Sequence, residues 1–154
     1  MAEFTAGLFL NQSLHWMAKP KATGIPVVLA FNLIDRSLSE IPLSPVCVEL
    51  YESRIGLGCI GRYLRVLGGC LSMYYRGGDH AADEIWVMEK YKVPSSWTRS
   101  FVLPPNTSYN TNKKRFWPLC YTKGGALLAS SVQNSSRLGT ILKLNENGQV
   151  LDLP

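Results

Sequence analysis

The sequence lacks the long apolar run that a membrane-spanning protein needs. Of its 154 residues 46% are hydrophobic, yet no stretch approaches the roughly 18 consecutive apolar residues of a membrane span. The N-terminus also lacks a basic leader, since its apolar run from Gly7 to Leu10 is short and no lysine or arginine precedes it. These absences predict a chain with no membrane partner and no secretory signal, located in the cytoplasm or the nucleus.

Cysteine pairs and the common catalytic signatures are missing as well. The four cysteines, Cys47, Cys59, Cys70 and Cys120, form no C-x-x-C pair, and their apolar surroundings predict core thiols in a reducing compartment. The sequence contains no glycine-flanked serine elbow and no zinc-type H-E-x-x-H pattern. We therefore expect no catalysis, no cofactor and no metal site.

Acidic residues are fewer than basic ones, and the resulting charge is spread along the chain. The 16 lysines and arginines outnumber the 11 acidic residues, which gives a net charge of +5. The dense basic run Lys113 to Arg115 stands among Asn, Thr and Ser residues, which is typical of a solvated loop tip rather than of a nucleic-acid patch. The sequence therefore predicts no nucleic-acid partner.

Glycines are present in one suggestive arrangement. The segment Gly56 to Gly61 reads GLGCIG and matches the G-x-G-x-x-G turn of dinucleotide-binding proteins, which requires a strand before it and a helix after it. Upstream, Val46 to Tyr51 could be a strand, but four residues intervene before the first glycine. Downstream, the six residues Arg62 to Leu67 are too few for a crossover helix. We therefore interpret Gly56, Gly58 and Gly61 as turns or bulges between strands.

Short apolar or alternating runs occur along the whole chain, whereas no window sustains a helical period beyond two turns. This pattern predicts a fold that is nearly all β. The runs that we expect to form strands are Gly7 to Leu10, Leu14 to Met17, Val27 to Leu33, Leu71 to Tyr75, Ile85 to Met88, Ser100 to Leu103 and Leu138 to Leu144.

These runs recur in the same order. Leu14, Leu71 and Leu127 follow similar hairpin-like segments and are 57 and then 56 residues apart. Strands centred on Phe31, Trp86 and Leu142 follow at spacings of 55 and 56 residues. A period near 50 residues with about four strands is the signature of a kelch-type β-propeller. We predict a single, incomplete propeller domain over residues 1–154, with two and a half to three blades at 7–45, 64–104 and 116–154. An unrelated β-sandwich with coincidental spacing is the alternative.

The same blocks resemble the F-box-associated domain, the kelch-like propeller region of a large family of plant F-box proteins that includes the self-incompatibility-locus members. The most specific match is Ile85 to Val93 with Ser96 to Arg99, which resembles the family's "tryptophan-valine-methionine … tyrosine-glycine-valine … serine-tryptophan-threonine" stretch. Further blocks that agree in order and spacing are Leu10 to Trp16, Ala30 to Leu33 with Leu38 to Leu43, and Leu67 to Leu71.

The chain also departs from that family. Asn32 stands where an aspartate is usual and Lys92 where a glycine is usual. The helical F-box expected before the propeller is absent from these residues, so docking to the ligase adaptor is not expected of them. The resemblance implies the target-recognition part of a substrate receptor for an SCF-type ubiquitin ligase, whose partner is an unknown target protein. It leaves a fragment, a truncated gene product and a degenerate copy open as alternatives.

Both histidines have a structural and a chemical interpretation. His15 lies in an expected inner strand, where a ring satisfied by a neighbouring backbone group is more plausible than a ligand or a base. Around His80, the acidic residues Asp79, Asp83 and Glu84 could bind a metal or move protons. The segment Arg76 to His80 is glycine-rich, so we interpret it as a solvated loop. Trp86, Trp97 and Trp117 are expected to fill the space between blades.

Partner binding in a propeller falls to loops at one end of the blades. The candidate loops are Lys19 to Ile25, Arg76 to Asp83 and Pro104 to Arg115. The candidate partner-binding residues on them are Arg76, Asp79, His80, Tyr109, Lys113 and Arg115. The alternative function is an enzyme on a β scaffold, either nucleotide-dependent through Gly56 to Gly61 or carbohydrate-active.

Overall fold

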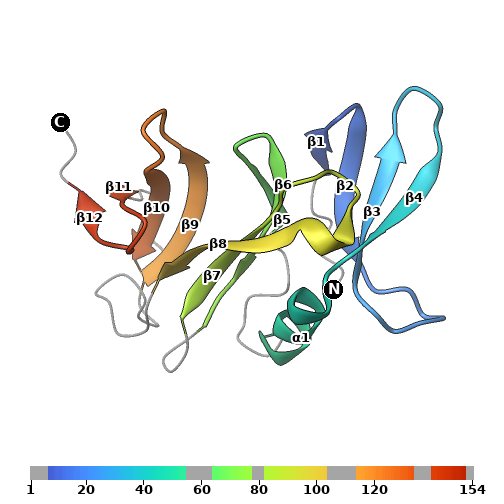
Figure 1. Cartoon of the computed structure of the whole chain (residues 1–154), viewed down its shortest axis with the longest axis horizontal. Helices are drawn as coiled ribbons and strands as arrows, with labels where there is room; N and C mark the ends of the chain where they lie inside the picture. Colours follow the sequence, from blue (N-terminus) through green and yellow to red (C-terminus); the bar gives the residue numbers. More distant parts are fainter. Residues whose placement is uncertain (1–6, 55–63, 78–81, 104–113, 134–139, 152–154) are drawn as a thin grey trace. The chain divides into compact units, whose positions relative to one another are not determined.

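The structure, a computed structural model, describes residues 7–54, 64–77, 82–103, 114–133 and 140–151. In this part of the chain it contains three four-stranded antiparallel sheets, one α-helix and one short 3-10 helix (Figure 1). The predicted all-β fold class is confirmed. No helix in the described residues is long and apolar enough to cross a membrane. The chain divides into two compact units, one of Met1–Met73 and Trp86–Thr98 and the other of Tyr74–Ile85 and Arg99–Pro154.

Each sheet takes its four strands from consecutive segments, and neighbouring strands follow the chain order. The first sheet contains β1 (Leu8–Leu10), β2 (Ser13–Ala18), β3 (Val27–Asn32) and β4 (Leu38–Pro42). The second contains β5 (Leu64–Leu67), β6 (Cys70–Tyr75), β7 (Asp83–Met88) and β8 (Trp97–Leu103), with the 3-10 helix η1 (Pro94–Ser96) before β8. The third contains β9 (Lys114–Tyr121), β10 (Leu127–Gln133), β11 (Thr140–Leu144) and β12 (Val150–Leu151).

The recurring apolar residues occupy equivalent strands of the three sheets. Leu14, Leu71 and Leu127 lie on the second strands, β2, β6 and β10, and Phe31, Trp86 and Leu142 lie on the third strands, β3, β7 and β11. Tight turns precede the second strands, and all three use residues with positive φ: Asn11 and Gln12 before β2, Gly68 and Gly69 before β6, and Gly125 before β10. Such backbone conformations match the right-handed twist of a hairpin.

The first sheet has one buried face and one open face, because successive residues of a strand point to opposite sides. In the strand pairing, His15 lies opposite Ala30 and Met17 lies opposite Val28. On its other side, Val28 lies opposite Ile41. Val28, Ala30 and Ile41 are buried, with Ile41 only 1% exposed. The next row of residues across the sheet points to the opposite face and is apolar: Phe9, Leu14, Phe31 and Leu38. Its two outer members, Phe9 and Leu38, are exposed.

Within the same unit, the segment Trp86–Thr98 contacts this sheet through Tyr91, which bonds to His15, and through Trp97. The Trp97 side chain is 4% exposed, and its indole N–H donates a hydrogen bond to the Pro42 carbonyl at 3.4 Å. Trp97 is thus a buried aromatic side chain, while its predicted place between blades stays a prediction. Strand β1 also contacts β5.

The interpretation of Val46 to Tyr51 as a strand is wrong, because this segment lies in the helix α1 (Pro45–Arg54). Ser44 caps the helix: its hydroxyl accepts the Cys47 N–H at 3.3 Å and its carbonyl accepts the Val48 N–H at 3.0 Å. Pro45 takes the first position, where its missing N–H has no consequence. The Ser-Pro pair was the sequence signal for this helix, and it outweighed the short apolar alternation that favoured a strand.

The cysteines do not all behave as predicted. Cys47 is buried and Cys70 half-buried, but Cys120 is exposed on β9, so the prediction of a core thiol is wrong there. Strand β9 is one of the two edge strands of its sheet. Cys59 and the glycines of residues 56–61 lie outside the described residues.

Two residues of β4 provide a test of this division into faces. Ile41→Ala removes a fully buried side chain, so we expect the free energy of unfolding to fall by about 2–5 kcal/mol. Leu38→Ala, on a side chain that is 63% exposed, should change it by less than about 0.5 kcal/mol. Chemical denaturation of both variants measures these values, and equal losses would contradict the assignment of the buried face.

Candidate functional site

The turns at one end of the first sheet lie beside each other. Because the strands run antiparallel, the β1–β2 turn (Asn11–Gln12) and the β3–β4 turn (Leu33–Ser37) emerge from the same end of the sheet. A hydrogen bond from the Leu33 N–H to the Gln12 carbonyl, 2.9 Å long, joins the two turns. We call this end of the sheet the turn end.

Short polar side chains hold the β3–β4 turn in shape. The Asn32 side-chain oxygen accepts the N–H groups of Ile34 at 2.8 Å and Asp35 at 3.2 Å. The Asp35 carboxylate accepts the N–H and the hydroxyl of Ser37, at 2.9 and 2.6 Å. The Ser37 hydroxyl is the main cause that lowers the pKa of Asp35 below its ordinary value. The turn therefore presents Leu33 and Ile34 outward, 46% and 70% exposed.

Hydrogen bonds of Ser96 hold the loop between β7 and β8 (residues 89–96) in shape. The Lys90 N–H donates to the Ser96 hydroxyl at 3.0 Å, and that hydroxyl lies 2.7 Å from the Val93 carbonyl. Lys92 sits in this loop with a φ of 62°, and Arg36 has a φ of 59° in the β3–β4 turn. A side chain in this left-handed region costs about 1 kcal/mol relative to glycine. Lys92 thus retains a long cationic side chain at a position suited to glycine.

His15 fastens the β7–β8 loop to the first sheet. Its ring is 1% exposed; Nδ1 lies 3.0 Å from the Leu8 carbonyl and Nε2 lies 2.7 Å from the Tyr91 hydroxyl. Since a carbonyl can only accept, Nδ1 carries the proton, and the Tyr91 hydroxyl donates to Nε2. The two rings meet edge to face, with centroids 5.7 Å apart. This is the satisfied core histidine that the sequence predicted, with a second partner 76 residues away.

Electrostatics keep this pair neutral. Burial lowers the pKa of His15 below its ordinary value and the nearby charge of Lys92 lowers it further, while the bond to the Leu8 carbonyl opposes the shift. Burial likewise raises the pKa of Tyr91, so its hydroxyl stays protonated as a donor. The charge of Lys92 also contributes to lowering the pKa of Asp35, after the bonds from Ser37. Lys92 is therefore near both the buried pair and the β3–β4 turn.

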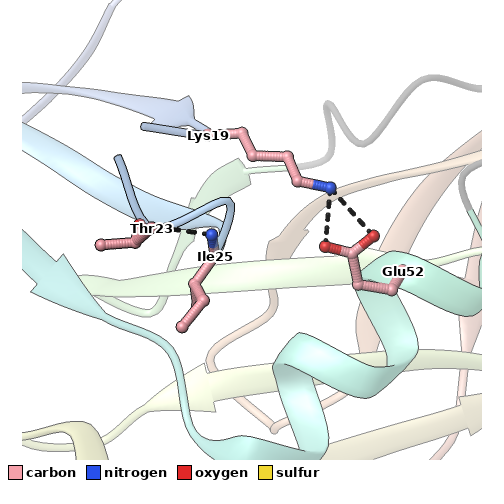
Figure 2. Close-up of polar contacts among 4 residues, drawn as sticks. All are labelled: Lys19, Thr23, Ile25 and Glu52. Atoms are coloured by element: carbon pink, nitrogen blue, oxygen red, sulfur yellow. Dashed lines mark hydrogen bonds and ion pairs between the residues drawn. The ribbon is translucent and has the colours of Figure 1, made fainter. Parts of the chain in front are cut away.

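The opposite end of the first sheet carries the predicted loop Lys19 to Ile25. The Lys19 ammonium contacts both carboxylate oxygens of Glu52 on α1, at 2.9 and 3.1 Å, as Figure 2 shows. The Ile25 N–H donates to the Thr23 hydroxyl at 3.3 Å (Figure 2). Both charged groups are well exposed, so this ion pair contributes at most about 1 kcal/mol. It ties the loop to the helix rather than leaving Lys19 available.

The candidate partner-binding residues from the sequence do not form one described site. Arg76 is half-buried just after β6. Arg115 belongs to strand β9 by its backbone, so its assignment to a loop is wrong: the strand already begins at Lys114. The remaining candidates lie outside the described residues: Asp79, His80, Tyr109 and Lys113.

The carboxylates of Asp83 and Glu84 are structural. Asp83, taken as the end of a solvated loop, begins β7 and is 2% exposed. The Tyr74 hydroxyl and the Gly77 N–H, the latter at 2.7 Å, both donate to its carboxylate. Glu84 is 8% exposed and pairs with Arg99 at 3.3 Å. Among the described residues no group of three His, Cys, Asp or Glu could hold a metal ion.

The sequence reasoning missed the residues that shape the turn end. Leu33, Ile34, Arg36 and Val93 were not singled out, although an apolar pair inside the turn-forming stretch Asn32 to Ser37 is unusual enough to have signalled an exposed anchor. Lys92 was noted only as a departure from a glycine. Their proximity depends on the His15–Tyr91 contact, which spans too much sequence for local patterns to show.

Curated proteins similar to this chain are plant F-box proteins. F-box protein CPR1 of Arabidopsis thaliana is 30% identical over 120 residues, which are 76% of this chain and 27% of that protein. F-box protein At4g22390 of the same plant is 28% identical over 137 residues, 86% of this chain and 31% of that protein. The chain thus spans about a third or less of the length of the curated relatives it matches. No protein-family model matches the chain, and no solved structure matches it.

Acidification should weaken the fold through His15. Because the pKa of His15 is lowered in the folded chain, the unfolded chain binds a proton at about pH 6.5 that the folded chain does not. The stabilisation is complete above that pH and is lost as the pH falls toward the folded-state pKa, by at most about 1.4 kcal/mol per pH unit. Urea denaturation from pH 7.5 to 5.5, roughly one unit either side of that value, measures the slope.

The control for this prediction is His15→Leu, which keeps His80 and every carboxylate of the chain. We expect its stability to depend less steeply on pH than that of the unmodified chain, whatever its absolute stability. Parallel pH dependences for the two proteins would show that His15 titrates normally in the folded state.

Proposed function

We propose that this chain is the target-recognition part of a substrate receptor for an SCF-type ubiquitin ligase. The observation that carries the proposal is its similarity to F-box proteins over 76% and 86% of its length. In this role the 154 residues bind a target protein and carry out no chemistry themselves. In this proposal an F-box docks to the ligase adaptor. The receptor acts in the cytoplasm or nucleus.

The proposal includes the architecture. We assign the three sheets to consecutive blades of a kelch-like propeller of the F-box-associated type, at 7–45, 64–104 and 116–154. Four antiparallel strands per sheet, connected in chain order, are what a blade requires. The equivalent positions of Leu14, Leu71 and Leu127 on second strands also support tandem copies of one module.

The order of elements around Gly56 to Gly61 speaks against the nucleotide-binding alternative. The helix α1 ends at Arg54, before these glycines, and the strand β5 begins at Leu64, after them. A dinucleotide fingerprint needs the reverse order, because the helix must follow the glycines to direct its N-terminal amides at the pyrophosphate. Binding of a target protein is therefore a better account of this chain than nucleotide binding.

The receptor role is testable by supplying the F-box in cis. The chain, fused behind the F-box segment of a plant F-box protein, is expressed in plant cells, and proteins that co-purify with it under proteasome inhibition are identified. We expect a co-purifying protein to become ubiquitinated and shorter-lived with the fusion but not with the chain alone, because only the fusion joins target and ligase.

Two controls make this experiment decisive. The F-box segment without the chain shows whether ubiquitination requires target recognition by these residues. Co-purifying proteins whose half-lives are the same with the fusion and with the chain alone would refute the receptor role while leaving any binding activity intact.

A further inference from the structure

The turn end presents exposed apolar residues next to two cations. Leu33 and Ile34 of the β3–β4 turn are 46% and 70% exposed, and Val93 of the β7–β8 loop is 38% exposed. Arg36 and Lys92 lie in the same two segments and are also exposed. We call this set of five residues the turn-end surface. All of it belongs to one compact unit of the chain.

The two cations occupy backbone conformations that glycine would adopt without strain. Arg36 and Lys92 have φ values of 59° and 62°. A residue with a side chain persists in this region when the surrounding structure or a function retains it. Neither residue needs its charge for the turn itself, since Asn32, Asp35 and Ser96 make the hydrogen bonds that hold the two segments. The hydrogen bonds that hold the two segments therefore do not use the charged ends of these side chains.

The two carboxylates nearby keep their charge, but among the described residues neither forms an ion pair with Arg36 or Lys92. The Asp35 carboxylate accepts two hydrogen bonds from Ser37, and Glu89 accepts one from the Thr98 hydroxyl at 3.0 Å. Lys92 lies over the Tyr91 ring, 5.6 Å from its centroid. Between residues that the structure describes, Arg36 forms no ion pair. A binding partner thus meets a cationic side chain in each of the two segments that carry the exposed apolar side chains.

We propose that the turn-end surface binds an acidic segment of a target protein in which carboxylates flank an apolar anchor residue. The anchor packs on Ile34, Leu33 and Val93, and the carboxylates pair with Arg36 and Lys92. Arginine and aliphatic side chains side by side suit such a segment because the anchor excludes water from the charged pairs. This inference rests on the proposed function and specifies the chemistry of its target.

A displayed library of random twelve-residue peptides, selected on the immobilised chain, tests the proposal. We expect enrichment of peptides that place Asp or Glu beside Leu, Ile or Phe. Binding of an enriched peptide, measured by fluorescence anisotropy, should weaken at least about tenfold in the Arg36→Glu, Lys92→Glu double variant, because two attractive pairs become repulsive. The control Lys21→Glu, an exposed residue in the loop at the opposite end of the sheet, should bind as the unmodified chain does.

A second double variant separates binding from folding. Arg36→Gly with Lys92→Gly removes both charges but suits the positive φ of both positions, so its melting temperature should equal or exceed that of the unmodified chain. Its peptide affinity should nevertheless fall by about tenfold. A glycine variant that binds normally would overturn the proposed role of the two cations.

The remaining outcomes also decide the matter. Enrichment of neutral or basic peptides, no enrichment, or equal weakening by Lys21→Glu would each contradict the proposal. Tighter binding of a single-stranded oligonucleotide than of any peptide, lost in the same variants, would reassign the surface to nucleic acid. These results are independent of the F-box fusion experiment, because peptide binding requires no ligase.

Discussion

The contact between the first sheet and the segment Trp86–Thr98 is the constraint on which the turn-end surface depends. A four-stranded sheet with apolar side chains on its inner face must cover that face, and here the cover includes Trp97, with Tyr91 fixed on His15. The bond between Tyr91 and His15 holds the β7–β8 loop against the first sheet. The charge of Lys92 in that loop thereby acts on Asp35 in the β3–β4 turn.

The hydrogen bonds that position the buried pair His15 and Tyr91 also satisfy it without a charge. His15 donates to the Leu8 carbonyl and accepts from Tyr91, so both ring nitrogens are satisfied without a charge. A charged ring at this place would need solvent or a carboxylate, whereas Lys92 nearby is itself a cation. Neutral hydrogen bonds thus hold the inner face while charge is kept outside, at Arg36 and Lys92.

Much of the fold could be predicted from local patterns, since strands alternate and turns use particular residues. The runs Leu14 to Met17, Val27 to Leu33 and Ile85 to Met88 became β2, β3 and β7 with small changes at their ends. The helix α1 was not predicted because its apolar residues give no periodic stripe. Its sequence signal is instead the Ser44–Pro45 pair at its start. Cap chemistry was therefore a stronger signal at this position than hydrophobic periodicity.

The candidate site was less predictable, since it depends on contacts between distant segments. Asp83 looked like a loop residue because glycines precede it, but a buried bond from Tyr74 draws it into β7. Polar loops such as Lys19 to Ile25 attracted the prediction, while the exposed apolar residues of a turn did not. Composition can indicate that a loop is solvated, but only the register of the sheet shows which turns share an end.

A double-mutant cycle on His15→Leu and Tyr91→Phe tests the central claim most directly, because it isolates the interaction between the two side chains from their separate losses. The account predicts that the two changes in unfolding free energy are non-additive, with a coupling of about 0.5–3 kcal/mol. Additivity within about 0.3 kcal/mol would show that the hydroxyl and the ring do not hold the loop to the sheet.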